Sequence, residues 1–90
     1  MTNNGTDDAH IELTVYTRTG CHLCDDMLAG LAVMQSSLSL SVDIVDIDAE
    51  PRLQRLYGHL VPVLMHQDTE ICHFFLDVEA LKAYFSKTII

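Results

Sequence analysis

Two cysteines three residues apart, Cys21 and Cys24, lie where the pattern of apolar residues changes its period. Before them, apolar and polar residues alternate over residues 12–17, which predicts a β-strand with one buried face. After them, apolar side chains recur every three or four residues from Cys24 to about Ser37, which predicts an α-helix. The cysteine pair is therefore expected at the junction between a strand and the helix that follows it.

The rest of the chain continues this alternation. Three further strands are expected, at residues 41–48, 61–66 and 70–76. A turn at residues 67–69 would make the last two an antiparallel hairpin at a sheet edge, whereas the first two strands, joined by a helix, should be parallel. Asp48 is predicted to cap a short helix that Gly58 ends, and Asp77 to cap a last helix. The order βαβαββα predicts an α/β fold with a four-stranded mixed sheet flanked by helices.

The length and charge of the chain limit its organisation and its partners. The chain has 90 residues and a formal charge of −8, and no linker or internal repeat is visible. We expect one domain at residues 11–90, behind a flexible arm at residues 1–10. The scarcity of Lys and Arg argues against binding to nucleic acids or to anionic membranes. The sequence has no visible secretory signal or membrane-spanning run, so we expect a cytoplasmic location. We also expect the protein to be a monomer.

In the reducing cytoplasm, a Cys-x-x-Cys pair is expected to be redox-active or metal-binding. Cys24 begins the apolar stripe of the helix and should be shielded, whereas Cys21 should be accessible. The free N–H groups and the dipole at a helix start favour a thiolate at Cys21. Arg18 and a protonated His22 would strengthen this effect, and the acidic residues 25–26 would oppose it. In the predicted chemistry Cys21 attacks a substrate disulfide and Cys24 resolves it, and the exchange requires no flavin, nicotinamide or metal.

A proline stands at the head of the third expected strand. Proline cannot donate to a strand ladder, so the simplest interpretation is a trans residue that begins the strand. A cis bond before Pro62 would instead aim the Val61 backbone at Cys21, where an extended substrate segment can pair with it. The substrate-binding candidates are therefore Val61 and Pro62, together with Arg18 and His22.

With these elements the sequence resembles the glutaredoxins, and more closely a group of short bacterial glutaredoxin-like proteins of the thioredoxin-fold superfamily. The resemblance runs from about residue 12 to residue 85. It rests on three segments: Tyr16-Thr-Arg-Thr-Gly-Cys-His-Leu-Cys24, Val45-Asp-Ile-Asp48 and Gly58-His-Leu-Val-Pro62. It implies a thioredoxin-like fold, Cys21 as the nucleophile, Cys24 as the resolving thiol and Pro62 as a cis proline. It also implies protein or small-molecule disulfide substrates and a reducing system, with glutathione as one candidate reductant.

The sequence departs from the glutaredoxins in three places. His22 and Leu23 stand between the cysteines, where proline and an aromatic residue are usual. Leu60 stands where threonine usually precedes the Val-Pro pair. The Gly-Gly turn and acidic pair that hold the γ-glutamyl end of glutathione are missing, and residues 74–77 (Phe-Phe-Leu-Asp) take their place. The resemblance therefore supports the redox chemistry and leaves the glutathione site open.

Two functions of other classes also remain open. Cys72, with Cys21, Cys24 and a histidine, would supply four ligands to a zinc ion, and an iron–sulfur cluster bridging two subunits is a related alternative. Cys72 lies in an apolar strand, however, where a buried structural cysteine is the commoner role. The fold also serves as a binding module without catalysis, and in that case Cys21 has the reactivity of an ordinary thiol.

Overall fold

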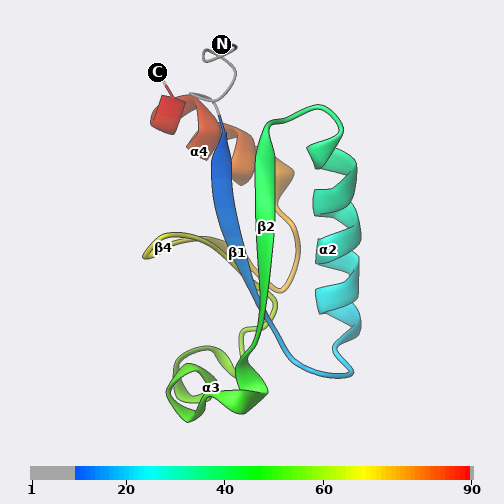
Figure 1. Ribbon diagram of the computed structural model, residues 1–90, viewed down its shortest axis with the longest axis vertical. Helices are drawn as coiled ribbons and strands as arrows, with labels where there is room; N and C mark the ends of the chain where they lie inside the picture. Colours follow the sequence, from blue (N-terminus) through cyan, green and yellow to red (C-terminus); the bar gives the residue numbers. More distant parts are fainter. Residues whose placement is uncertain (1–9, 90) are drawn as a thin grey trace, which may run out of the picture.

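The computed structural model describes residues 10–89, whose strands and helices follow the predicted order (Figure 1). The strands are β1 (Ile11–Thr17), β2 (Leu40–Asp46), β3 (Val63–His66) and β4 (Thr69–His73). The helices are α2 (His22–Gln35), α3 (Pro51–Tyr57) and α4 (Val78–Ile89), and a short 3₁₀ helix, η1 (Ile47–Ala49), precedes α3. Among these described helices, none is long and apolar enough to cross a membrane. The predicted arm, apart from His10, lies outside the described residues.

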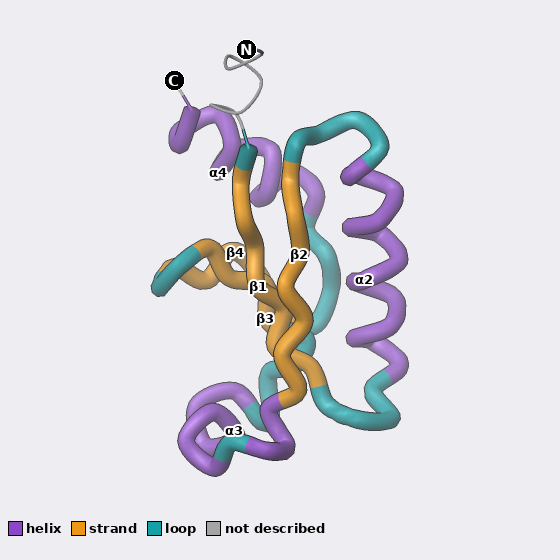
Figure 2. The backbone as a smooth tube through the Cα atoms, in the orientation of Figure 1, coloured by secondary structure: helices purple, strands orange, loops and turns teal. Residues whose placement is uncertain are grey.

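The four strands form one mixed sheet in the order β2-β1-β3-β4 (Figure 2). β1 and β2 are parallel, as predicted for two strands joined through a helix. β3 runs antiparallel to β1, and β4 pairs antiparallel with β3 at the edge, so the predicted hairpin is confirmed. Tyr16 near the end of β1 lies opposite Val63 at the start of β3. The loop that leads to the cysteines therefore leaves the sheet beside the point where Pro62 leads into β3.

The core lies between one face of the sheet and the helices α2 and α4. Its members from β1, β3, α2 and α4 include Leu13, Val15, Leu64, Met27, Leu31, Leu81 and Phe85. The apolar stripe predicted after the cysteines is thus the face that α2 buries, and each such side chain contributes about 1.5–3 kcal/mol when fully buried. Figure 1 shows α3 apart from these helices, where β1 and β2 end. There Tyr57 stacks on Tyr16 with ring centroids 4.7 Å apart.

The last strand is shorter than predicted. β4 ends at His73 instead of residue 76, because Phe74 adopts a φ of 66° and leaves the ladder. The backbone N–H of Phe74 donates to the carbonyl oxygen of Pro62 at 2.9 Å. β3 also starts later than predicted, at Val63, since Pro62 has no N–H to give to the sheet.

The predicted helix cap at Asp48 is wrong. The carboxylate of Asp46 accepts the backbone N–H of Asp48 at 2.9 Å, so η1 begins two residues earlier, with Ile47 fully buried. Helix α3 starts only at Pro51, and its N-cap residue Glu50 makes no side-chain capping bond. Burial of Ile47 therefore fixes the turn, and Asp48 is left exposed with its carboxylate free for another partner.

Two other predicted helix ends are confirmed. Gly58 follows the last residue of α3, and its N–H donates to Gln54 O at 2.8 Å. The carboxylate of Asp77 accepts the N–H of Ala80 at 2.9 Å, which caps the start of α4. The end of α3 therefore sets where the loop before β3 begins, and this loop contains the candidates Val61 and Pro62. The start of α4 sets where the loop after β4 ends.

Candidate active site

The structure places Cys21 and Cys24 at the start of α2 and joins them by a disulfide. Their Cα atoms are 5.2 Å apart, a spacing that a disulfide bridges without backbone movement. Cys21 is the N-cap residue and is half-buried, whereas Cys24 lies in the first turn and is only 2% exposed. Solvent therefore reaches the pair from the Cys21 side.

The backbone at the helix start is arranged around the sulfur of Cys21. The N–H of Cys24 donates to Cys21 Sγ at 3.1 Å, in the position where a serine or aspartate oxygen usually caps a helix. Such a bond and the helix dipole stabilise negative charge on the sulfur once the disulfide is reduced. Asp25 and His22 are both exposed, so solvent screens their opposing effects. The N-cap position of Cys21 is thus built to hold a thiolate.

The loop before the cysteines depends on a glycine and on an ion pair. Gly20 adopts a φ of 77°, a conformation that L side chains rarely take. Arg18 Nε donates to Asp48 Oδ1 at 2.8 Å, and Arg18 Nη1 donates to Gly58 O at 3.4 Å. Thr19 Oγ1 also lies 3.3 Å from a carboxylate oxygen of Asp46. Arg18, predicted as a substrate-binding residue, is thus held by the chain's own carboxylate and ties the cysteine loop to η1 and α3.

We expect the Arg18–Asp48 pair to contribute little to stability. The two side chains are 44% and 36% exposed, and ion pairs with that exposure have coupling energies of about 0.2–1 kcal/mol. A double-mutant cycle with Arg18→Ala and Asp48→Asn, measured by urea unfolding, should give a value in this range. A coupling well above about 1 kcal/mol would contradict the screened, surface character of the pair.

The second candidate segment lies at the start of β3. The Val61–Pro62 peptide bond is cis, the side chain of Pro62 is fully buried and that of Val61 is half-buried. The hydrogen bond from Phe74 to Pro62 O joins this segment to the end of β4. The sheet thus brings the cysteine loop, the segment 61–62 and Phe74 to the same end of its strands, where β1 and β4 end and β3 begins. Sequence reasoning missed Phe74, because a phenylalanine gives no local signal for a positive φ.

Cys72, the third cysteine, lies on β4 opposite Leu64 and packs half-buried against the core. Burial raises the pKa of its thiol, a hydrogen bond from the backbone of Asp77 acts in the opposite direction, and nearby carboxylates raise the pKa further. Within residues 10–89, no three His, Cys, Asp or Glu side chains gather in a group that could hold a metal ion. The four-ligand zinc set considered above is therefore not assembled in the described structure.

We expect Cys72 to alkylate slowly in the folded, oxidised protein, where it is the only free thiol. Because its pKa is raised, the thiolate fraction at a given pH is smaller than in the unfolded chain, so the pH profile of alkylation should shift upward on folding. Timed maleimide labelling with and without urea, read by mass, measures both profiles. A faster reaction in the folded state would contradict this account.

The fold and the cysteine pair define a thioredoxin-like α/β protein with a dithiol suited to redox chemistry. Residues 12–86, nearly the whole of the described chain, match a family described as "glutaredoxin-like domain (DUF836)". The chain belongs to this glutaredoxin-like family. The resemblance read from the sequence is thereby confirmed at the level of the family and the fold.

Solved structures agree with this assignment. A Nitrosomonas europaea protein is 44% identical with a TM-score of 0.74, over 81% of this chain and 88% of that one. An X. campestris protein is 32% identical with a TM-score of 0.67, over 84% and 97% of the two chains. The germline-specific thioredoxin Deadhead of Drosophila melanogaster is 24% identical with a TM-score of 0.51, over 96% and 87%, and shares the fold alone. No curated protein matches the chain.

Proposed function

We propose that this protein is a thiol–disulfide oxidoreductase that works through Cys21 and Cys24. The observation that carries the proposal is their placement at the start of α2, within disulfide distance, with Cys21 partly open to solvent and Cys24 buried. This difference in exposure divides the roles. An incoming disulfide meets Cys21, and Cys24 is reached only by the sulfur beside it.

The reaction is a two-step exchange. The Cys21 thiolate attacks one substrate sulfur, so that a Cys21–substrate disulfide forms, the substrate disulfide breaks and one substrate thiolate leaves. The Cys24 thiolate then attacks Cys21 Sγ, which forms the Cys21–Cys24 disulfide and releases the second substrate thiolate. The substrate gains two electrons and takes up two protons through solvent, and the protein dithiol loses both. A thiol reductant, glutathione or a dithiol reductase, returns the pair to the reduced state.

Three further residues are assigned to the substrate. An extended substrate segment pairs with the backbone of Val61 beside Cys21, and the buried Pro62 holds that backbone in place. His22 is exposed next to Cys21 and contacts the incoming chain. Arg18 acts on the substrate indirectly, by positioning the loop, because its guanidinium already binds Asp48. A protein disulfide suits this arrangement better than glutathione. The Gly-Gly turn with which glutaredoxins bind glutathione is replaced here by residues 74–77.

The test is a redox titration of the full chain in glutathione buffers, with thiols trapped by maleimide and counted by mass. We expect one two-electron transition confined to Cys21 and Cys24, with Cys72 still labelled in the oxidised protein. Stoichiometric zinc or iron in the freshly purified protein, lost in the Cys21→Ser variant, would overturn the proposal in favour of a metal site.

A further inference from the structure

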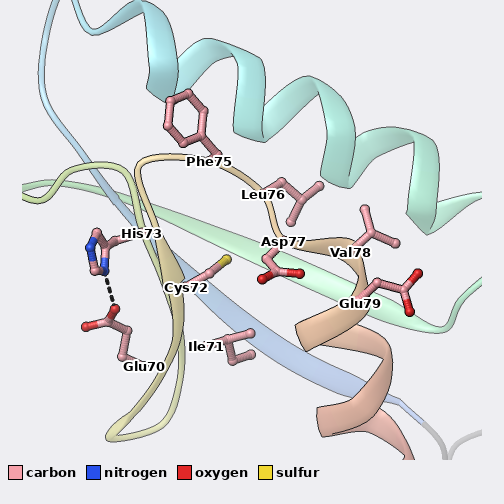
Figure 3. Close-up of a pocket in the computed structure, with 9 residues that line it drawn as sticks. All are labelled: Glu70, Ile71, Cys72, His73, Phe75, Leu76, Asp77, Val78 and Glu79. Atoms are coloured by element: carbon pink, nitrogen blue, oxygen red, sulfur yellow. Dashed lines mark hydrogen bonds and ion pairs between the residues drawn. The ribbon is translucent and has the colours of Figure 1, made fainter.

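A groove of about 740 Å³ lies between the end of β4 and the start of α4 (Figure 3). Its apolar lining comes from Ile71, Cys72, Phe75, Leu76 and Val78. Phe75 is 66% exposed and Val78 is 37% exposed, so the groove presents apolar surface to solvent. A groove of this volume is large enough for a few side chains of another molecule.

The charge around the groove has one sign. Glu70, Asp77 and Glu79 line it, and no Lys or Arg is among its lining residues in the described chain. His73 forms a hydrogen bond with Glu70 at 2.5 Å, and one carboxylate oxygen of Asp77 caps α4. The carboxylate of Glu79 has no hydrogen-bond or ion-pair partner among the described residues, so it is open to a ligand. The whole chain carries a formal charge of −8, which adds to this local field. Apolar walls with an acidic rim fit an apolar segment that carries Lys or Arg.

The backbone at Phe74 connects the groove to the candidate active site. Phe74 lies between the two, because its N–H binds Pro62 O and its chain neighbour Phe75 lines the groove. On the other side, Leu76 packs so closely on α2 that a Cβ at Gly30 would lie 2.8 Å from its Cδ2. Figure 3 shows Phe75 and Leu76 on the side of the groove toward α2, the helix that begins at the cysteines.

We propose that this groove docks an apolar, Lys- or Arg-bearing segment of a protein whose disulfide is reduced at Cys21. This inference rests on the proposed function and adds the substrate class to it. The ring of Phe75 is the apolar anchor, and Glu79 supplies the charge that selects a basic segment. The docked segment raises the local concentration of the substrate disulfide beside Cys21, so its loss should raise KM and leave kcat nearly unchanged.

Binding is tested without any redox step. Two peptides of the same apolar sequence are made free of cysteine, one with Lys and Arg at its polar positions and one with Glu there, and each is titrated into the full ¹⁵N-labelled chain. We expect the basic peptide alone to shift the amide signals of Phe75, Leu76 and Glu79. Equal binding of both peptides, no binding, or shifts confined to another surface would overturn the proposal.

The same peptides with one disulfide each then serve as substrates. Phe75→Ala and Glu79→Gln should each raise KM for the basic substrate about tenfold, with kcat and the reduction of hydroxyethyl disulfide unchanged. The matched controls are Val33→Ala, another exposed apolar residue at 71%, and the exposed Glu50→Gln, and neither should change KM.

The two proposals fail in different ways. Reduction of hydroxyethyl disulfide with no peptide preference and no effect of Phe75→Ala would overturn the docking groove and leave the oxidoreductase standing. Binding of the basic peptide at Phe75 with no reduction of any disulfide would overturn the oxidoreductase and, with it, the role of the groove in substrate selection.

Discussion

Replacing Cys21 by serine is expected to reduce disulfide-reductase activity by about three orders of magnitude or more, as removal of a nucleophile does in other covalent mechanisms. The half-buried sulfur of Cys21 is the one that solvent and substrate reach, and a serine hydroxyl there does not ionise near neutral pH. Turnover of hydroxyethyl disulfide, with a dithiol as reductant, measures the loss.

The matched control for this variant is Cys72→Ser. Cys72 lies half-buried on β4, outside the cysteine pair, and burial raises the pKa of its thiol, which makes it a poorer nucleophile. Cys72→Ser should therefore keep activity within about twofold, apart from a loss of stability on the order of 1 kcal/mol. Loss of activity in Cys72→Ser, with activity kept in Cys21→Ser, would contradict the assignment of Cys21 as the nucleophile.

The substitution Leu64→Ala should destabilise the domain by about 2–5 kcal/mol. Leu64 is fully buried on β3, where it lies opposite Val15 of β1 and Cys72 of β4, and it belongs to the cluster that α2 and α4 cover. Loss of its side chain leaves a cavity in the centre of the sheet. The expected loss is a large part of the 5–15 kcal/mol by which domains are usually stable. Urea unfolding followed by circular dichroism measures it.

The control is the same substitution on the surface. Leu56 lies on α3 and is 50% exposed, so Leu56→Ala should change the free energy of unfolding by less than about 1 kcal/mol. Similar losses for Leu64→Ala and Leu56→Ala would contradict the core described here. A loss at Leu64 with active-site chemistry retained at low temperature would show that the core supports the site without entering the reaction.

The sequence predicted the fold well where a periodic pattern of apolar residues extends over many positions. The alternation at residues 12–17 and the helical stripe after Cys24 each extend over several side chains, so burial of one face determines the element. The two clear errors lie where contacts distant in sequence decide. Burial of Ile47 moves the turn ahead of Asp48, and Pro62, which lies opposite Phe74 in the register of β3 with β4 and has no N–H to donate, ends the ladder at His73. Neither contact leaves a pattern in the local sequence.

The site divides in the same way. The spacing of Cys21 and Cys24 at the head of the helical stripe predicts a closed pair with one shielded sulfur, and the structure has that arrangement. The partner of Arg18 was not predicted, because Asp48 lies 30 residues away and reaches Arg18 only through the pairing of β1 with β2. The groove beyond Phe74 was missed for the same reason, since β4, the loop after it and α4 form it together.

The most direct test of the central claim is to trap the mixed disulfide. The Cys24→Ser variant lacks the resolving thiol, so its reaction with a disulfide peptide should stop at a covalent adduct. Mass spectrometry of the intact protein and of its digest should find one peptide per chain, on Cys21. An adduct on Cys72, or no adduct while the small disulfide is still reduced at the wild-type rate, would contradict the assignment of Cys21 as nucleophile and Cys24 as resolving thiol.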